Sequence, residues 1–379
     1  MSSNALTEHA GYFRDQRKVD AYRRALSVVV RPGDTIVDLG SGTGLLGLLA
    51  AEAGASTVYM VDEGSILGVA CEVAERNGLG DRLIPIRGHS ADVAVPTPAD
   101  VVVCDQIGGF VYDAGVLDFF HDAKARLLRP GGALIPSAFT LFAAPVIAPE
   151  VRDAIDVWST RPAGFDTEPL HRLAVNNAWH VEPDDVEITA TASSLFTFDS
   201  ASLEPVRTTA EFEFDRSAGV DGILGWFDAE LAPAVHLTNS PEVVDRMRRW
   251  CNFYPLAQPL QVESGDRLDV TIDLRPASSL MAWTVTWQRG TERLGRWRHS
   301  TVLGQFMSPE DLARAGTSPL QLTEQGAAIA AALADVDGKA TAAEIIGRVL
   351  IDHPDAFASE ARARTVLAAQ IAKWTRAQR

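Results

Sequence analysis

The chain has few cysteines and no long apolar run, and each shortage excludes a class of protein. Its 379 residues include three cysteines, Cys71, Cys104 and Cys251, which are far apart and form no pair pattern. A disulfide-rich secreted domain is therefore excluded, and a reduced cytoplasmic setting is expected. No window approaches membrane length, and the first residues have neither the basic start nor the apolar core of a signal peptide. We expect no membrane partner.

Basic residues and metal-ligand patterns are also scarce. The eight histidines show no metal-ligand spacing, so no metal site is expected. Lys and Arg number 34 against 50 Asp and Glu, which gives a net charge of −16. Such a charge repels polyanions, so we expect no nucleic-acid partner. It would attract a cationic amine or peptide, although simple solubility explains the same charge.

The most informative segment is residues 37–44, which read Val-Asp-Leu-Gly-Ser-Gly-Thr-Gly. An apolar stretch at 35–37 precedes the glycines and another at 45–51 follows them, which predicts a strand, a turn and a helix. Glycines there let the backbone turn sharply and approach a ligand closely. Asp62 ends a second apolar run, where an acid can hold two ribose hydroxyls. The loop therefore predicts an adenosine-containing cofactor, and a glycine turn without function is the alternative.

The glycine spacing decides which cofactor is expected. The dinucleotide pattern requires a glycine where Leu45 stands, and no Gly-Lys-Ser/Thr follows to make a phosphate-binding loop. Instead Gly40, Gly42 and Gly44 alternate with other residues, and Asp38 lies two residues before the first. This spacing resembles the first motif of class I S-adenosylmethionine-dependent methyltransferases. The resemblance implies S-adenosyl-L-methionine as the cofactor.

Segments of different character divide the chain. Residues 1–33 have helical spacing, and residues 34–138 alternate strand and helix, which predicts a Rossmann-like parallel sheet with crossover helices. Residues 139–300 alternate polar and apolar side chains, which predicts an antiparallel, β-barrel-like substrate domain. A polar and aromatic insertion near 149–177 interrupts it. Residues 308–379 predict a small, winged-helix-like domain of three helices.

The parallel-sheet segment allows its elements to be placed. We expect strands at residues 35–39, 57–61, 83–86, 100–104 and 132–135, and helices near 45–53, 65–77 and 114–127.

Residues 8 to about 290 resemble the protein arginine methyltransferase family. The segments that carry the resemblance are 15–22, 61–63, 88–90, 104–114, 225–228, 239–241 and 249–256. It implies that Lys18, where the family has an arginine, contacts the methionine carboxylate of the cofactor. The residues that it places at the cofactor are Lys18, Asp38, Gly40, Ser41, Gly42, Thr43, Gly44, Asp62, Glu63, His89, Ser90 and Asp105. It also makes 149–177 a dimerisation arm and the protein a homodimer.

The acceptor side departs from the family pattern. The family clamps the substrate guanidinium with two glutamates, because a planar cation with several donors binds two carboxylates bidentately. In this chain Asp105 stands in place of the family's first glutamate and is one methylene shorter. Ala114 aligns with the second glutamate, and the nearest acid, Asp113, comes one residue before that position. Arg249 replaces the histidine of the family's Thr-His-Trp signature, and this cation would disfavour a guanidinium substrate. The architecture is therefore expected, and the arginine chemistry is not.

Methyl transfer to an amine assigns roles to four residues. The reaction is an in-line displacement in which the protein mainly aligns the groups, while a carboxylate orients the amine and accepts its proton. Asp105 is the expected base, with Asp113 second and Tyr112 as an orienting hydroxyl. Alternatively, Asp105 caps a helix or binds the ammonium of the cofactor. Arg249 either holds a substrate carboxylate or pairs with Asp113.

The last segment carries a second, weaker resemblance. Residues 322–346, with a capping box at Thr341 and Glu344, resemble the small peptide-binding module of coenzyme PQQ biosynthesis. That module grips leader peptides of ribosomally made natural products. A plain helical cap or a dimer contact is the alternative.

These features together predict an S-adenosylmethionine-dependent N-methyltransferase that acts on an amine of a ribosomal peptide natural product or a related specialised metabolite. The first alternative is a protein or free arginine N-methyltransferase with an altered acidic clamp. The second is a non-catalytic scaffold that retains the cofactor.

Overall fold

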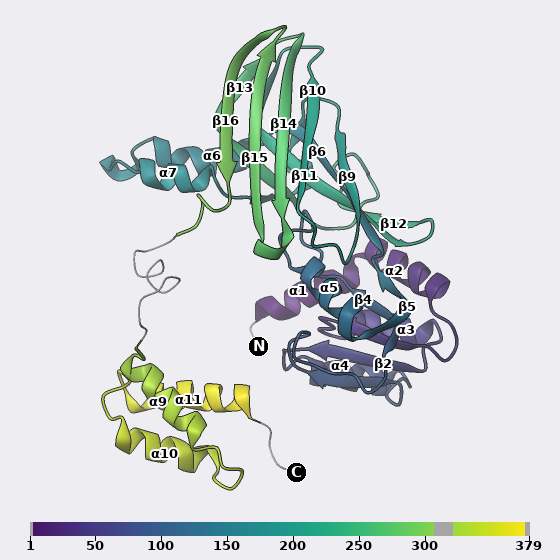
Figure 1. The fold of residues 1–379 in the computed structure, drawn as a ribbon, viewed down its shortest axis with the longest axis vertical. Helices are drawn as coiled ribbons and strands as arrows, with labels where there is room; N and C mark the ends of the chain where they lie inside the picture. The colour runs from purple at the N-terminus through teal and green to yellow at the C-terminus, as the bar shows by residue number, and fades with distance from the viewer. Residues whose placement is uncertain (1–2, 307–320, 376–379) are drawn as a thin grey trace. The chain divides into compact units, whose positions relative to one another are not determined.

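The computed structural model describes residues 3–306 and 321–375 (Figure 1). The chain divides into two compact units, Met1–Gln305 and Phe306–Arg379. Across the described residues, no helix is long and apolar enough to cross a membrane. The same residues contain no group of three or more His, Cys, Asp or Glu that could hold a metal ion. All three cysteines are free thiols.

Two helices precede the first sheet, α1 (Ser3–Arg14) and α2 (Gln16–Val29). They are separated at Asp15, whose carboxylate caps α2 by accepting a hydrogen bond from the backbone N–H of Lys18 at 3.2 Å. The buried face of α2 carries Lys18 and Tyr22, which lie one helical turn apart. The cap and the helical spacing therefore direct both side chains toward the sheet.

The first sheet is parallel, as predicted, and its strands run in the order β3-β2-β1-β4-β5. The strands are β1 (Thr35–Leu39), β2 (Thr57–Asp62), β3 (Leu83–Arg87), β4 (Ala99–Cys104) and β5 (Leu128–Ile135). The connecting helices are α3 (Leu45–Glu52), α4 (Leu67–Arg76) and α5 (Val116–Arg126). The strand order reverses between β1 and β4. In open α/β sheets, a crevice for ligands forms at the carboxyl ends of the strands at such a point.

The antiparallel part forms two sheets. The larger has the order β7-β13-β11-β6-β8, with β12 paired to β11 and β9 paired to β6. Its strands are β6 (Ala138–Ile147), β7 (Trp179–Val181), β8 (Glu187–Ile188), β9 (Ser193–Asp199), β11 (Ala218–Ala232), β12 (Val235–Thr238) and β13 (Cys251–Val262). The smaller has the order β10-β14-β15-β16, formed by β10 (Val206–Glu213), β14 (Asp266–Arg275), β15 (Leu280–Arg289) and β16 (Glu292–Ser300).

The expected barrel-like closure is not observed. In the smaller sheet, β10 pairs with β14 and β16 pairs with β15, so each of these outer strands has a sheet partner on one side. A barrel requires a continuous ladder of hydrogen bonds around the ring. The described strands therefore form two packed sheets and no closed barrel.

One hydrophobic core joins the parallel sheet to the antiparallel part. Buried residues of β14, on alternate positions as predicted, belong to the same cluster as the buried strands β1 and β4. Phe110, in the loop after β4, is fully buried and meets the ring of Tyr254 on β13 edge to face at 5.6 Å. The loop after β4 is thus held between the two parts of the first unit.

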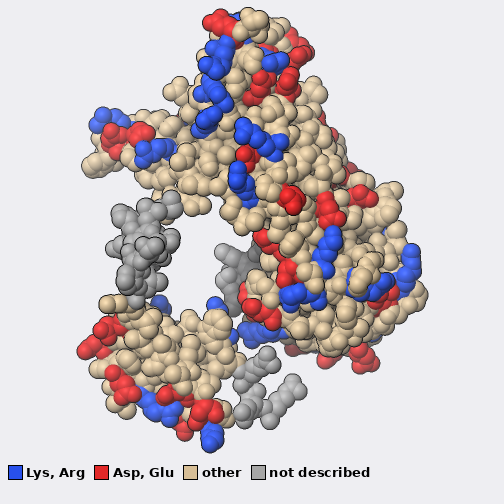
Figure 2. Space-filling view, viewed as in Figure 1, with Lys and Arg blue, Asp and Glu red and all other residues tan. Residues whose placement is uncertain are grey.

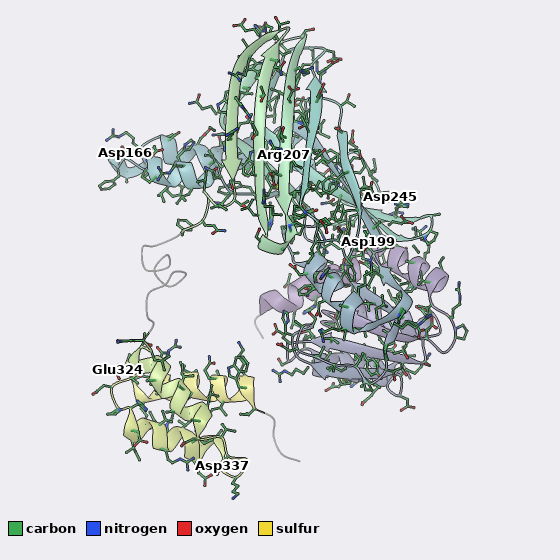
Figure 3. All side chains as sticks on the ribbon, in the orientation of Figure 1. Asp166, Asp199, Arg207, Asp245, Glu324 and Asp337 are labelled. Carbon is green, nitrogen blue, oxygen red and sulfur yellow. The ribbon has the colours of Figure 1, made fainter. Side chains whose placement is uncertain are left out.

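The insertion near 149–177 is more regular than the sequence predicts. It contains α6 (Pro149–Asp156), the short 3-10 helices η1 (Val157–Ser159) and η2 (Pro162–Gly164), and α7 (Glu168–Ala174). Pro149 occupies the first turn of α6, where its missing N–H removes no hydrogen bond. The helices project from the antiparallel sheets as an arm, with Asp166 at its outer end (Figures 1 and 3).

The second unit contains three helices, α9 (Glu324–Ala334), α10 (Ala342–Asp352) and α11 (Glu360–Trp374). They pack around a small apolar core to which Ala328, Ala332, Ile345, Ile346, Val349, Leu367 and Ile371 contribute. The capping box at Thr341 and Glu344 forms as expected at the start of α10. Residues 321–375 contain no strand, so no wing accompanies these helices in the described part.

Candidate active site

The loop between β1 and α3 has the backbone that its glycines predict. Gly40, Gly42 and Gly44 have φ angles of +69°, +52° and +82°. Residues other than glycine adopt such angles only with backbone strain. Asp62, at the end of β2, accepts a hydrogen bond from the N–H of Gly42 at 2.9 Å and from that of Gly64 at 2.6 Å. The acid therefore holds the loop in place through neutral backbone donors.

Two side chains lie directly over this loop. A Cβ atom added to Gly40 would overlap the amide of Gln106, and one added to Gly42 would lie 2.8 Å from Cε1 of His9. Gln106 belongs to the loop after β4, and His9 belongs to α1. The glycines thus permit a close approach of two other segments as well as of a ligand.

A cleft of about 180 Å³ opens beside the loop at the carboxyl ends of β1 and β2. Its lining consists of Leu39, Gly40, Val61, Asp62, Glu63, Gly88, His89, Ser90, Gln106 and Phe119. The rings of His89 and Phe119 meet edge to face at 6.0 Å, and the carboxylates of Asp62 and Glu63 border the same space. Aromatic rings suit a planar base and carboxylates suit ribose hydroxyls, so the residues present fit an adenosine moiety.

Other predicted cofactor residues shape the loop from beneath. Asp38 is buried, and one of its oxygens accepts the N–H of Gly47 at 2.9 Å while the other has no hydrogen-bond partner. Burial raises the pKa of Asp38 to about 7. The Ser41 hydroxyl donates to the carbonyl of Asp38 at 2.7 Å, and Thr43 is half-buried in the loop. Asp38 and Ser41 thus support the loop from within.

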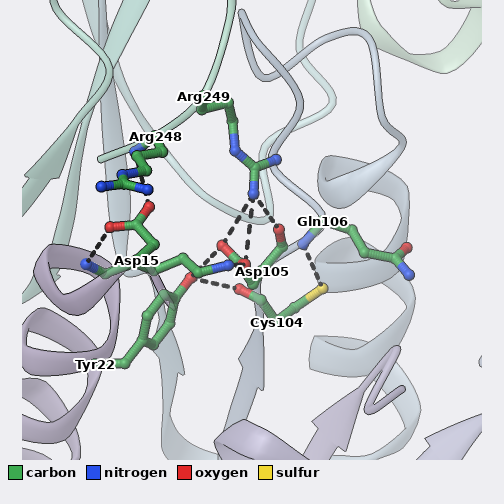
Figure 4. A network of polar contacts seen from close by, with 8 residues as sticks. Asp15, Tyr22, Cys104, Asp105, Gln106, Arg248 and Arg249 are labelled. Atoms are coloured by element: carbon green, nitrogen blue, oxygen red, sulfur yellow. Dashed lines mark hydrogen bonds and ion pairs between the residues drawn. The ribbon is translucent and has the colours of Figure 1, made fainter. Parts of the chain in front are cut away.

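The carboxylate of Asp105, directly after β4, lies at the centre of a polar network (Figure 4). Lys18 Nζ lies 2.5 Å from its Oδ2, and Arg249 Nη2 lies 3.4 Å from both of its oxygens. The Tyr22 hydroxyl lies 3.0 Å from the carbonyl of Cys104 and 3.4 Å from Asp105 Oδ1. The side chains of Lys18, Asp105 and Arg249 are 4%, 17% and 9% exposed. Two largely buried cations therefore face one carboxylate.

This network links residues that the sequence assigned to different roles. Lys18 was expected at the cofactor and Asp105 at both the cofactor and the acceptor, and the two form one ion pair. Arg249 pairs with Asp105 and not with Asp113, its expected alternative partner. Asp105 can therefore receive an acceptor nitrogen only if its contacts with these cations rearrange.

The other two predicted catalytic residues have structural contacts. Asp113 accepts hydrogen bonds from the N–H groups of Gly109 at 2.9 Å and Phe110 at 3.1 Å, which closes the loop after β4. Tyr112 packs its ring against Phe198 at 5.7 Å, and burial raises the pKa of its hydroxyl. The hydroxyl in the Asp105 network is that of Tyr22, not that of Tyr112.

The same loop contains an unusual backbone conformation. Val111 is fully buried and has a φ of +67°, which is an outlier for a β-branched residue. Such strain costs about 1 to 3 kcal/mol and persists where the surroundings impose it, commonly at functional sites. The loop after β4 is therefore a rigid, packed element.

Two family models match the chain. The model described as PRMT5 oligomerisation domain matches residues 138–288, and the model described as Ribosomal protein L11 methyltransferase (PrmA) matches residues 23–141. The boundary between the two matches coincides with the change from the parallel to the antiparallel part.

The relatives in sequence are named as arginine methyltransferases. The chain is 31% identical over 238 residues to "Probable protein arginine N-methyltransferase 6" of Arabidopsis thaliana, a match that covers 59% of this chain and 54% of that protein. It is 28% identical over 271 residues to "Arginine N(omega)-methyltransferase" of Streptomyces achromogenes subsp. streptozoticus. This match covers 69% of this chain and 74% of that protein. The chain thus spans about half the length of the first relative.

Solved structures share the fold. A "Trypanosoma brucei PRMT1 enzyme-prozyme heterotetrameric complex with AdoHcy" matches with a TM-score of 0.68 at 19% identity and covers 77% of this chain and 96% of that one. The structure of Arabidopsis thaliana protein arginine methyltransferase 10 matches with a TM-score of 0.66 at 20% identity. This match covers 78% of this chain and 98% of that one. The fold is that of a protein arginine methyltransferase. The methyltransferase class is common to these structures, to the named relatives and to the family model over residues 23–141.

Within this arginine methyltransferase fold, two residues that build the site, Asp15 and Asn239, lie in segments that carry the resemblance but had no role assigned from the sequence. Asp15 accepts the N–H of Arg248 at 2.7 Å and so places the following Arg249 above α2. Asn239 donates to the carbonyls of Gly109 at 2.9 Å and Trp250 at 2.8 Å, which ties the loop after β4 to the antiparallel part. The spacing of an N-cap aspartate three residues before Lys18 was a readable signal for Asp15. Asn239 lies in the segment 239–241 that carries the resemblance, but its contacts with Gly109 and Trp250 join distant segments and could not be predicted from sequence.

Proposed function

We propose that this chain is an S-adenosylmethionine-dependent N-methyltransferase and that its acceptor is the guanidinium of an arginine, free or within a peptide or protein. The observation that supports this most is the similarity to relatives named arginine N-methyltransferases over more than half of the chain. The position of Asp105 after β4, beside the cleft at the glycine loop, agrees with it.

The cofactor would occupy the cleft beside the glycine loop. Asp62 and Glu63 would hold the ribose hydroxyls, and the rings of His89 and Phe119 would bound the base. Lys18 would hold the methionine carboxylate, because it is the largely buried cation at that end of the site. The cofactor supplies an activated methyl group when it is bound.

The acceptor nitrogen would be oriented by Asp105. In the structure Lys18 pairs with Oδ2 of Asp105. If Lys18 moved to the methionine carboxylate of the cofactor, that oxygen of Asp105 would be free. That oxygen would then accept a hydrogen bond from the acceptor nitrogen and receive its proton as the methyl group is transferred. Arg249 would stay on the other side of Asp105 and fix its orientation.

A second candidate is methylation of an amine on a ribosomally made peptide. The observation in its favour is that Asp113 bonds to the backbone of its own loop, so Asp105 stands without a second free carboxylate from this loop. An amine requires a single carboxylate, whereas a guanidinium binds best to two. The three-helix unit, a predicted peptide-binding module, would then hold the leader peptide.

Intact-mass measurement after incubation with S-adenosylmethionine separates these candidates. The substrates are free arginine, an arginine-rich protein and an amine-bearing peptide encoded beside the gene. Added methyl masses on a guanidinium support our proposal, and methyl masses on the peptide amine alone overturn it in favour of the second candidate. Cofactor binding without turnover on any substrate would show the scaffold alternative.

We further propose that the chain forms a homodimer through the arm and acts in the cytoplasm. Phe165 is 72% exposed on the arm, and Val157 and Leu170 of the same arm also expose apolar surface. Apolar side chains gathered on a projecting element are typical of a contact surface. The double substitution Phe165→Ser and Leu170→Ser should convert a dimer to a monomer in light scattering, and a wild-type monomer would contradict the proposal.

A further inference from the structure

One face of α5 borders the part of the cofactor cleft where the base would lie. Phe119, Asp122 and Arg126 stand three and four residues apart in this helix, a spacing that places their side chains on the same side. Phe119 lines the cleft and meets the ring of His89 edge to face. His89 belongs to the loop at residues 88–93, which Arg126 also contacts. The helix therefore holds this loop at two points.

The guanidinium of Arg126 joins the loop to the helix. Its Nη2 donates to the carbonyl of Ser90 at 2.7 Å, and its Nη1 donates to the carbonyl of Val93 at 2.9 Å. Asp122, one turn earlier in α5, accepts from Nε at 2.7 Å and from Nη2 at 2.5 Å. One guanidinium makes all four bonds because its five N–H donors point in fixed directions. Asp122 thus orients Arg126, and Arg126 bridges two points of the loop.

The peptide group between Ser90 and Ala91 is held at both of its ends. Arg126 binds its carbonyl, and its N–H, which belongs to Ala91, donates to Nδ1 of His89 at 3.2 Å. Because Nδ1 accepts this bond, the neutral imidazole carries its hydrogen on Nε2. The orientation of the His89 ring, which borders the cleft, therefore depends on Arg126 through one peptide plane.

The loop itself contributes little to the hydrophobic core. Of residues 88–93 only Val93 is buried, and the N–H of Ser90 donates to no acceptor within the described part of the chain. On the face shown in Figure 2, basic and acidic side chains adjoin in several places, so an ion pair alone does not distinguish Arg126. Its two bonds to loop carbonyls distinguish it, because they fix a segment that has little burial of its own.

We propose that Arg126, oriented by Asp122, is a positioning residue for the base of the cofactor, and that it holds residues 88–93 in the shape that recognises the edge of adenine. The inference rests on the proposed position of the cofactor in this cleft and does not depend on the acceptor. The free N–H of Ser90 is a fixed donor beside the cleft. Adenine presents an amine donor next to a ring-nitrogen acceptor, and a loop of fixed shape favours that order over its reverse.

Equilibrium binding of two product analogues tests this role without requiring turnover. S-adenosylhomocysteine carries adenine, whereas S-inosylhomocysteine carries hypoxanthine, in which a carbonyl replaces the amine and the adjacent ring nitrogen bears a hydrogen. By calorimetric titration, the wild-type protein should bind the adenine compound about tenfold more tightly, as expected for the loss of one hydrogen bond to a fixed partner. In Arg126→Met this preference should fall to about twofold, because the loop can then adapt to either base.

Two further variants separate positioning from a general loss of stability. Asp122→Asn alone should reduce the preference in part, and it keeps the test in place if Arg126→Met does not fold. Since Asp122 acts through Arg126, the double variant should show no greater loss than Arg126→Met. Lys124→Met is the matched control, because this lysine of the same helix pairs with Asp199 at 3.5 Å. It should keep the wild-type preference.

An equal loss of affinity for both compounds in Arg126→Met would show a purely structural role and overturn the inference. Equal binding of both compounds by the wild-type protein would overturn it as well. A failure of the proposed acceptor leaves these binding results unchanged, so the two failures are distinguishable. Absence of S-adenosylhomocysteine binding to the wild-type protein would overturn the cofactor position and this inference together.

Discussion

Asp62 and Asp105 stand at the carboxyl ends of β2 and β4, the two strands that flank β1 in one sheet, yet their surroundings differ. Asp62 accepts hydrogen bonds from two backbone N–H groups of nearby turns. Asp105 accepts contacts from Lys18 on α2 and from Arg249, which is 144 residues away in the chain. Asp62 is held by backbone groups of nearby turns, and Asp105 is held by side chains of distant segments.

This difference changes what each carboxylate can do. Backbone donors are neutral, so Asp62 keeps its negative charge for the hydroxyl donors of a ligand. Lys18 and Arg249 carry two positive charges against the single charge of Asp105. Asp105 therefore needs a rearrangement before it can receive a nitrogen, whereas Asp62 is ready to bind.

The largest expected effect is that of Asp105→Asn on turnover. The amide keeps the volume of the side chain but accepts no proton, so methyl transfer should fall by about 10²- to 10⁴-fold while cofactor binding changes little. Single-turnover kinetics measure the rate of methyl transfer, and calorimetric titration with S-adenosylhomocysteine measures cofactor affinity separately. The control is Asp245→Asn, which removes an exposed ion pair with Arg17. Full activity of Asp105→Asn would show that the acceptor half does not depend on this carboxylate.

Substitution of Asp62 should weaken cofactor binding. Asp62→Ala removes one hydrogen bond to the glycine loop, from Gly42, and one to the turn after β2, from Gly64, each worth about 1.5 to 3 kcal/mol when the acceptor is charged. Cofactor binding should weaken by about 100-fold, and the folded state should persist. Calorimetric titration with S-adenosylhomocysteine measures the affinity. A change of less than twofold would mean that the glycine loop holds its shape without the acid.

The buried Asp38 gives the cofactor half a pH dependence. Its pKa of about 7 lies above its ordinary value of 3.8 because of burial, so the folded state holds more protons than the unfolded state between these values. The free energy of unfolding should fall by about 2 kcal/mol as pH rises from 5 to 7, and level off above 7. Urea unfolding at several pH values measures this slope. Asp38→Asn should flatten it, and equal slopes in the two proteins would contradict the assignment.

Tyr22→Phe should have the smallest effect. It removes the hydroxyl that bonds to the carbonyl of Cys104 and lies near Asp105, so stability should fall by about 1 kcal/mol. Turnover should fall only a few-fold, because the two cations still orient Asp105. Tyr112→Phe is the matched control and should leave turnover unchanged. A larger loss for Tyr112→Phe than for Tyr22→Phe would reverse our assignment of the hydroxyl.

The sequence predicted most of the parallel part because its signals are local. The strands β1 to β4 and the helices between them lie within a few residues of their expected positions, since apolar runs and glycine turns mark each boundary. β5 begins at Leu128, four residues earlier than expected, because Leu128 already pairs with Ala99 of β4 and the Pro-Gly-Gly segment forms an irregularity before the pairing resumes at Ala133. The arm was expected to be irregular, since its helices are short and its apolar spacing is incomplete.

The contacts that join segments far apart in the chain could not be predicted from the sequence. The sequence shows a cation at Arg249, but its pairing with Asp105 depends on how the segment before β13 packs against the start of α2. Asp113 and Tyr112 were expected at the acceptor because residues 104–114 resemble the family's substrate loop, and their role in catalysis stays a prediction. The turn of the loop after β4 directs Asp113 to its own backbone and Tyr112 into the core.

The sequence by itself determined the glycine loop, the acid at the end of β2 and the change from parallel to antiparallel strands. Those features depend on backbone freedom and on hydrophobic periodicity, which are properties of neighbouring residues. The tertiary structure alone decided that two sheets form in place of a closed barrel and that Lys18 and Arg249 share Asp105. Charge pairing and cavities depend on distances in space, and no local pattern encodes those distances.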